Sequence, residues 1–185
     1  MGRRLPEVLT REQARALLAT PNRYYRTGLR DLCMIKLMLN AGFRSSEVLD
    51  LTWIEVDLHT GRLTVRRGKG DKNRQVWVNE STLVLMRAWR ERSPSCVYCF
   101  PTLHGTRIHG QALREMMKRR GKKAGIAKGV HPHMLRHTYA TKLYREKKDI
   151  RLMQKALEHA HLSTTMIYTH IVDDDMEAAM RAFDI

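Results

Sequence analysis

The sequence predicts a mainly α-helical fold of the α+β class, with a small three-stranded antiparallel sheet placed among the helices. Most of the chain carries apolar residues at the helical spacing of three and four positions, but the period changes to two between residues 53 and 78. The 185 residues, 43% of them hydrophobic and 29% charged, are enough for one domain with a real core. We therefore expect a single soluble domain over residues 1–185.

The charge balance predicts a polyanionic partner. The formal net charge is +15, from 34 Lys and Arg against 19 Asp and Glu. Clustered cations gain binding free energy when they release counterions from phosphates. Aromatic residues make up only 6%, which favours the backbone of double-stranded DNA over a stacking platform for single strands. No apolar run reaches the ~18 residues of a membrane span and no signal-peptide pattern is present, so we expect a cytoplasmic protein with no membrane partner.

Capping residues set the expected helix ends. Thr10 and Gln13 form a capping-box pair before the first helix. A longer and more apolar helix is expected over residues 27–40, closed by Gly42. Further helices are expected at residues 80–92, at residues 111–124, from Pro132 onward, and after Asp149.

Another helix start, at residues 43–48, carries an arginine and a glutamate. Ser45 or Ser46 is expected near its N-cap. Arg44 and Glu47 are three positions apart and can pair on one helical face. This is either an ordinary surface ion pair or a device in which Glu47 fixes the guanidinium. An arginine beside the unpaired N–H groups of a helix start also lies where phosphate binds well.

Three short strands, at residues 53–57, 62–67 and 75–78, form the expected sheet. The basic hairpin between the second and third has glycines on both sides of Lys69, which allow a close approach to another molecule. Lys72 and Arg74, with the basic helix over residues 111–123, are expected phosphate contacts. The alternative for both segments is an ordinary charged surface.

Histidines and cysteines raise the question of a metal. His133, Arg136 and His137 share one face of a helical turn, which suits an anion better than a metal because no H-E-x-x-H glutamate is present. The three cysteines imply no disulfide framework, and Cys33 is expected in the core. Cys96 and Cys99 have zinc-like spacing to two histidines downstream, although Cys99 equally fits a buried extended segment.

The C-terminal part supplies a nucleophile candidate. His159 and Tyr168 are separated by a short polar turn, and Ser163 is expected to cap the helix that carries the tyrosine. Residues 173–185 have the pattern of one amphipathic helix, too short to be stable unless it docks on its own domain or on a neighbour.

Four ordered motifs carry a resemblance to a known family. AGFRSSEVLDLTW resembles the first arginine box of the tyrosine recombinase (phage integrase) family, and VRRGKGDKNRQVWV resembles its lysine hairpin. HPHMLRHTYAT resembles its H-x-x-R box, and LEHAHLSTTMIYTH its histidine-plus-tyrosine box. Nearly the whole chain is similar to the helical catalytic domain of this family, and most to the Xer-like and integron-integrase-like branch.

The resemblance implies a site-specific DNA recombinase that works without a metal, ATP or any other cofactor. In this chain it implies that Tyr168 is the nucleophile, which leaves a 3′-phosphotyrosine and a free 5′ hydroxyl. Lys69 would be the general acid for the leaving 5′ oxygen. His133 is the candidate that would take the proton from the tyrosine.

The same resemblance implies the residues that hold the phosphate. Arg44 and Arg136 would clamp the scissile phosphate, and His159 would donate a hydrogen bond to a non-bridging oxygen. Glu47 fills the acidic position that supports the active-site arginine. Fixed donors of this kind contribute about 3–4 kcal/mol each to stabilising a phosphodiester transition state.

Two departures from the family pattern stand out. Glu158 occupies the position before His159, where the family usually has glycine. The chain also carries no N-terminal core-binding domain, so it is expected to be either a fragment or a minimal enzyme. By analogy, the helix at residues 173–185 is exchanged between protomers of a tetramer on DNA. The alternatives are a type IB topoisomerase-like nicking-closing enzyme and a non-catalytic DNA-binding protein of the same fold.

Overall fold

A computed structural model of the chain describes residues 6–66 and 73–157. Within them the chain forms helices around a small sheet, in the order α1 (Arg11–Ala19), α2 (Arg26–Ala41), α3 (Ser45–Asp50), a 3₁₀ turn η1 (Trp53–Glu55), β1 (Val56–Asp57), β2 (Arg62–Val65), β3 (Arg74–Trp77), α4 (Glu80–Arg92), α5 (Gly110–Lys123), α6 (Pro132–Lys147) and α7 (Ile150–Leu157). The predicted fold class is confirmed.

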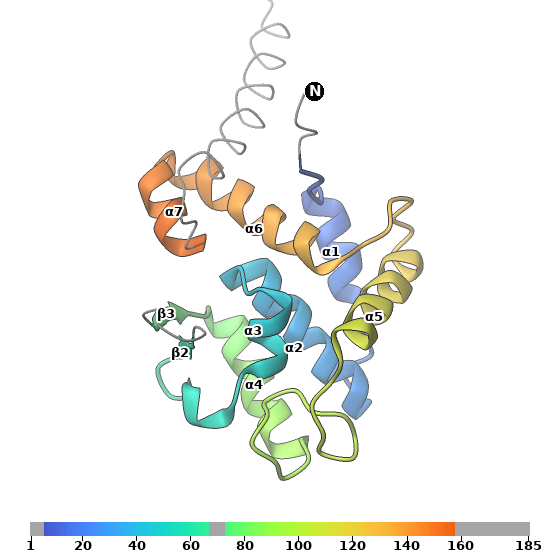
Figure 1. Ribbon diagram of the computed structural model, residues 1–185. Helices are drawn as coiled ribbons and strands as arrows, with labels where there is room; N and C mark the ends of the chain where they lie inside the picture. The colour runs from blue at the N-terminus through green and yellow to red at the C-terminus, as the bar shows by residue number, and fades with distance from the viewer. Residues whose placement is uncertain (1–5, 67–72, 158–185) are drawn as a thin grey trace, which may run out of the picture.

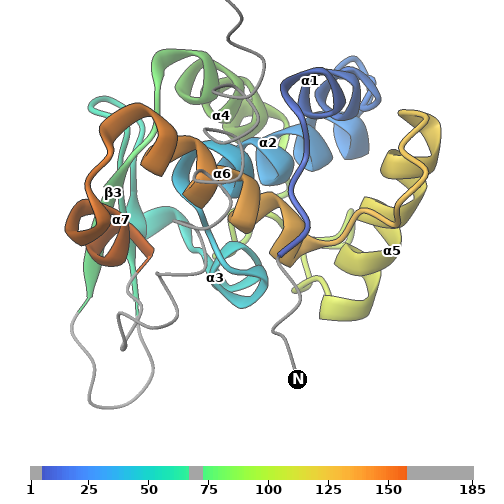
Figure 2. The same cartoon turned by 90° about the horizontal axis from the view of Figure 1, so that it is seen from above.

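Helix α2 is the centre of the fold (Figure 1). It packs against both α4 and α6, and residues on all its sides are buried. A helix that is apolar nearly all round is stable only inside the molecule. Cys33 lies there with no exposed surface, as expected. Helix α6 crosses α2 near the C-terminal end of α2 (Figure 2). Gly42 ends α2 there, in the left-handed conformation with φ of 65°.

The sheet is antiparallel, as predicted, and its strands lie in the order β1-β2-β3. Its first strand is shorter than expected, since only Val56–Asp57 is extended and residues 53–55 form the turn η1. The carboxylate of Glu55 accepts hydrogen bonds of 2.7 Å from the backbone N–H and from the hydroxyl of Thr52. This local capping closes a turn where the alternation of residues predicts a strand.

Most helix ends follow the predicted caps. The Thr10–Gln13 capping box is formed in both directions, Pro132 is the first residue of α6, and Asp149 accepts hydrogen bonds from two backbone N–H groups of α7. Helix α4 has the predicted bounds. The start of α3 differs, because the N-cap is Arg44 rather than Ser45 or Ser46. The Glu47 carboxylate accepts the N–H of Arg44 at 2.7 Å and so begins the helix one residue earlier.

Helix α7 extends the fold beyond the main core. Met153 and Leu157 are fully buried against Ala140 of α6 in a small apolar cluster of their own. No helix in the described part of the chain has the length and apolar character needed to cross a membrane. The predicted helix over residues 173–185 lies outside the described residues.

Candidate active site

Three arginines from separate elements surround one glutamate on the side of the molecule where α3, β3, α6 and α7 meet (Figure 2). Arg44 precedes α3, Arg74 begins β3, and Arg136 lies in the second turn of α6. Glu47, in the first turn of α3, is at the centre, with only 9% of its side chain exposed. Three guanidinium groups against one carboxylate give the cluster a net positive charge.

Each oxygen of Glu47 accepts two hydrogen bonds. Oε1 accepts from Nη1 of Arg44 at 2.7 Å and from Nη1 of Arg74 at 2.7 Å. Oε2 accepts from the backbone N–H of Arg44 at 2.7 Å and from Nη2 of Arg74 at 2.8 Å. Arg74 therefore makes the two-point contact that matches a planar guanidinium to a carboxylate. Nη1 of Arg136 lies 3.9 Å from Oε2, which is an ion-pair distance.

The arginines keep Glu47 ionised despite its burial. Burial alone would raise the pKa of this carboxyl, but the hydrogen bonds and charge of Arg74, followed by the hydrogen bonds of Arg44, lower the pKa to about 2. Glu47 is therefore a fixed anion at neutral pH, and the arginines around it keep fixed orientations.

Backbone carbonyl groups hold Arg136 from two sides. Its Nη1 donates to the carbonyl oxygen of Gly42 and its Nη2 to the carbonyl oxygen of Leu157. The same Leu157 oxygen accepts a hydrogen bond of 3.2 Å from Nη2 of Arg44. The end of α7 therefore brings together the two arginines to which the family resemblance gives the role of a phosphate clamp.

Arg44 and Arg136 differ in their exposure to solvent. Arg44 keeps 36% of its side chain exposed, whereas Arg136 keeps 7%. His133, one turn before Arg136 on α6, is exposed. Partial desolvation, followed by the positive charge of His131, Arg136 and Arg44, lowers the pKa of His133 below its usual value. His133 is therefore mainly neutral at pH 7, which is the state that can accept a proton.

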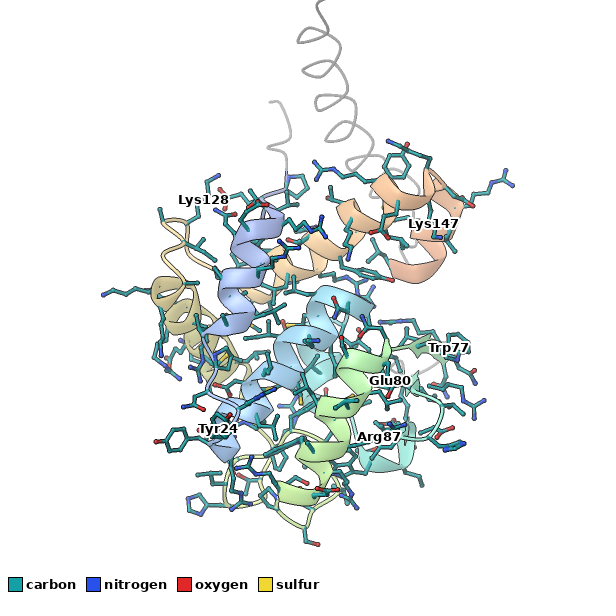
Figure 3. All side chains as sticks on the ribbon, turned by 180° about the vertical axis from the view of Figure 1, so that it is seen from behind. Tyr24, Trp77, Glu80, Arg87, Lys128 and Lys147 are labelled. Atoms are coloured by element: carbon teal, nitrogen blue, oxygen red, sulfur yellow. The ribbon has the colours of Figure 1, made fainter. Side chains whose placement is uncertain are left out.

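Arg74 lies in a different environment from the one expected for a phosphate contact. Its side chain is 8% exposed and its guanidinium is held by Glu47. The guanidinium carbon also lies 5.9 Å from the ring centre of the buried Phe43. Trp77, at the other end of β3, is 62% exposed and lies at the outer surface (Figure 3). The alternation along β3, which puts Arg74 on the same inward face as Val76, is the sequence signal that would have shown this.

Four of the predicted site residues, Lys69, Lys72, His159 and Tyr168, lie outside the described residues, as does Glu158. Among the predicted residues that the structure describes, Arg44, Glu47, Arg74 and Arg136 form one cluster, and His133 lies next to it. The carbonyl groups of Gly42 and Leu157 were not predicted, because no sequence pattern marks a backbone acceptor for a distant arginine.

The zinc alternative finds no support in the geometry. Residues 6–66 and 73–157 contain no group of three or more His, Cys, Asp or Glu side chains that could hold a metal ion. Cys99 is fully buried, and burial raises the pKa of its thiol, which disfavours the thiolate that zinc requires. Its carbonyl oxygen instead accepts a hydrogen bond of 2.7 Å from the indole N–H of Trp89.

Sequence comparison places the chain among known proteins. A model of the phage integrase family matches residues 7–174. Tyrosine recombinase XerC of Xanthomonas campestris pv. campestris (strain B100) is 35% identical over 184 residues, which cover 98% of this chain and 56% of that protein. The XerC of Xylella fastidiosa (strain 9a5c) is also 35% identical, with 61% of its length covered. The chain thus spans little more than half the length of these relatives.

Solved structures agree with the sequence comparison. The XerA recombinase superposes with a TM-score of 0.84 at 31% identity, covering 98% of this chain and 66% of that one. XerH recombinase bound to palindromic difH substrate, in a post-cleavage complex, superposes with a TM-score of 0.82 at 32% identity, covering 96% of this chain and 53% of that one. The Tn1549 transposon integrase shares the fold, with a TM-score of 0.75 at 19% identity.

Proposed function

Because this chain belongs to the phage integrase family, we propose that it is a site-specific tyrosine recombinase that cleaves and rejoins double-stranded DNA in the cytoplasm. Cleavage passes through a 3′-phosphotyrosine at Tyr168. The chain covers only part of its relatives, so the proposal concerns the chemistry of this domain. The XerH site-specific recombinase, captured in a post-cleavage complex with palindromic difH substrate, supports it.

The arrangement of Arg44 and Arg136 is the observation that carries the proposal. These two residues are 92 positions apart in sequence, yet both donate to the carbonyl oxygen of Leu157. Both also lie within ion-pair distance of Glu47. A phosphodiester transition state gathers negative charge on its non-bridging oxygens, and preorganised guanidinium donors stabilise that charge. Bringing two arginines together at net positive charge suits a phosphate held between them.

The reaction exchanges one phosphate ester bond for another, and therefore needs no cofactor. The phenol oxygen of Tyr168 attacks phosphorus, the bond to the 5′ oxygen breaks, and the phosphate stays on the enzyme as a 3′-phosphotyrosine. His133 accepts the phenol proton, and Lys69 gives a proton to the departing 5′ oxygen. Rejoining reverses these steps with a 5′ hydroxyl as the attacking group. A phenol with a pKa of about 10 needs such a base and nearby positive charge to react at neutral pH.

Binding and assembly follow from the same proposal. Lys72 and the basic helix α5 contact DNA phosphates, and His159 donates to the scissile phosphate. Recombination requires two DNA sites in one complex, so the active assembly is a homotetramer on DNA. Exchange of the helix over residues 173–185 between protomers would hold the tetramer together.

The two alternative functions predict different activities on DNA. A topoisomerase-like enzyme would relax supercoiled DNA as a monomer, whereas a recombinase joins two sites in an assembly of several protomers. A non-catalytic DNA-binding protein would bind duplex DNA and never form a covalent bond with it. The arginine cluster favours catalysis over simple binding, because Arg136 is too deeply buried to serve a general electrostatic surface.

A nicked suicide substrate, from which the cleaved strand diffuses away, tests the proposal. We expect a covalent protein–DNA adduct that is absent in Tyr168→Phe. In Arg44→Ala and Arg136→Ala the rate should fall roughly 100- to 1,000-fold, as for loss of one oxyanion donor. Tyr24→Phe, at an exposed tyrosine on the loop before α2, is the matched control and should react normally.

The result that would refute the assignment is an adduct that persists in Tyr168→Phe. Cleavage that disappears in the presence of a chelator would favour a metal-dependent nuclease instead. Supercoil relaxation by the monomer, without joining of two sites, would favour the topoisomerase.

A further inference from the structure

Arg74 stands out because it was expected on DNA and is found inside the protein. Its side chain is 8% exposed, and both ends of its guanidinium contact Glu47, at 2.7 and 2.8 Å. An arginine side chain that is 8% exposed and binds a buried carboxylate through both Nη groups presents little surface to a phosphate outside the protein. Its role must therefore be sought in what Glu47 does for the arginine clamp.

We propose, building on the recombinase function above, that Arg74 is a positioning residue that fixes the Glu47 carboxylate and thereby orients Arg44 for the scissile phosphate. The two-point contact sets the plane of the carboxylate. In that plane, Oε1 faces Nη1 of Arg44 and Oε2 faces the backbone N–H that starts α3. Arg44 is thus held by its backbone and by one end of its side chain.

Charge gives Arg74 a second effect on the same cluster. With Arg74 present, one carboxylate is shared by three guanidinium groups, and the four side chains carry a net charge of +2. Without it, Glu47 would be shared by Arg44 and Arg136 alone and would neutralise them more strongly. Because Arg136 is buried, the cluster would then give weaker stabilisation to the negative charge that develops on the scissile phosphate in the transition state.

The position of Arg74 also connects the sheet to the arginine cluster. Arg74 begins β3 and pairs with Val65 at the end of β2. Arg66, the next residue after β2, forms its own ion pair of 2.5 Å with the buried Glu55. The two strands of the hairpin are therefore each connected by an arginine to a carboxylate that precedes the sheet, Glu47 in α3 and Glu55 in η1. Arg74 is the one of these two that reaches the phosphate clamp.

The test compares Arg74→Gln with Arg62→Gln, which removes an equal charge from an exposed position at the start of β2. Three quantities are measured: affinity for duplex DNA, the rate of adduct formation at saturating DNA, and the ionisation of Glu47 by carbon NMR at pH 4.5. For Arg74→Gln we expect affinity within about twofold and a rate roughly 100-fold lower, the loss typical of a slightly misplaced catalytic group. Glu47 should become partly protonated, and Arg62→Gln should leave the rate and Glu47 unchanged.

A direct phosphate contact at Arg74 predicts the opposite pattern and would overturn the proposal. Affinity would then fall and the salt dependence of binding would weaken by about one phosphate, with the rate at saturation and Glu47 unaltered. Arg74→Lys covers the case in which Arg74→Gln fails to fold. A lysine keeps the charge but not the two-point contact, so a wild-type rate in Arg74→Lys would equally overturn the proposal.

The NMR measurement needs no DNA and no reaction, and this separates the two proposals. A wild-type chain that forms no adduct contradicts the recombinase function alone. An unchanged Glu47 in Arg74→Gln contradicts the role of Arg74 even where the wild type is active.

Discussion

Arg136 of α6 donates a hydrogen bond to the carbonyl oxygen of Gly42, the residue that ends α2. The two residues are 94 positions apart in sequence. Carbonyl groups at the C-terminal end of a helix carry partial negative charge and favour a cation. The end of the central helix therefore supplies a binding point for the buried arginine of the clamp, and the conformation of Gly42 decides where that carbonyl points.

Replacing Gly42 with alanine should destabilise the protein and displace Arg136. A φ of 65° costs a non-glycine residue about 1–2 kcal/mol. An added Cβ would also lie 2.4 Å from Cδ1 of Tyr139, so the ring or the backbone must move. We expect the free energy of unfolding in urea to fall by more than about 2 kcal/mol, with slower adduct formation.

Gly125→Ala is the control for the backbone contribution. Gly125 has a similar φ of 69°, and an added Cβ there would have no neighbour within 4 Å. It should lose only the conformational cost of about 1–2 kcal/mol. Equal losses in the two variants would show that the contact with Tyr139 is relieved without cost.

The contribution of Glu47 to stability should depend on pH in acid. Its pKa is about 2 in the folded protein, against an ordinary value of 4.5. A lowered carboxyl pKa stabilises the folded state above pH 5, and this stabilisation is lost as the pH falls from about 5 toward 2. At about 1.4 kcal/mol per pH unit the shift corresponds to about 3 kcal/mol.

The difference in unfolding free energy between wild type and Glu47→Gln measures this contribution. It should be largest near neutral pH and should shrink toward pH 3. Glu80→Gln is the control, since Glu80 is 70% exposed and forms only a surface ion pair of 3.2 Å with Arg87. A difference for Glu47→Gln that does not change with pH would mean that the carboxylate gains nothing from its arginines.

Helix ends were predictable because the interactions that set them are local. Thr10 with Gln13, and Asp149 with the first turn of α7, are contacts over two or three positions, and the sequence displays both partners together. The segment at residues 53–55 shows the limit of this reasoning. There the contact of Glu55 with Thr52 is equally local, but alternation of residues outweighed it and a strand was predicted.

The arginine cluster was predictable in most of its members and only partly in its connections. Resemblance to the family's motifs singled out Arg44, Glu47 and Arg136, and the pairing of Arg44 with Glu47 follows from helical geometry. The partner of Arg74 is 27 positions away in another element, and nothing local distinguishes it from a charged surface residue. Contacts of this kind depend on the packing of the sheet against α3.

The salt dependence of DNA binding should show whether α5 follows the phosphate backbone. Arg114 and Lys118 are exposed and lie four positions apart on this helix, so both can contact one strand. Replacing both with glutamine should reduce the slope of log affinity against log salt by about 1.8, at about 0.9 per phosphate contact. Arg87→Gln, on α4 (Figure 3), should leave the slope nearly unchanged. An unchanged slope in the double variant would remove α5 from the DNA interface.

The pH dependence of adduct formation should report the neutral form of His133. Its pKa is lowered by partial desolvation and by the positive charge of His131, Arg136 and Arg44. A base with a lowered pKa stays active to lower pH, so the rate at limiting DNA, which reports the DNA-free protein, should fall in acid with a midpoint below 6.5. His131→Asn removes one of these charges, while asparagine can still accept the N–H of Met134 at the N-cap. The midpoint should therefore move upward in His131→Asn, and a midpoint that stays in place, or a wild-type midpoint above 6.5, would exclude His133 as the base.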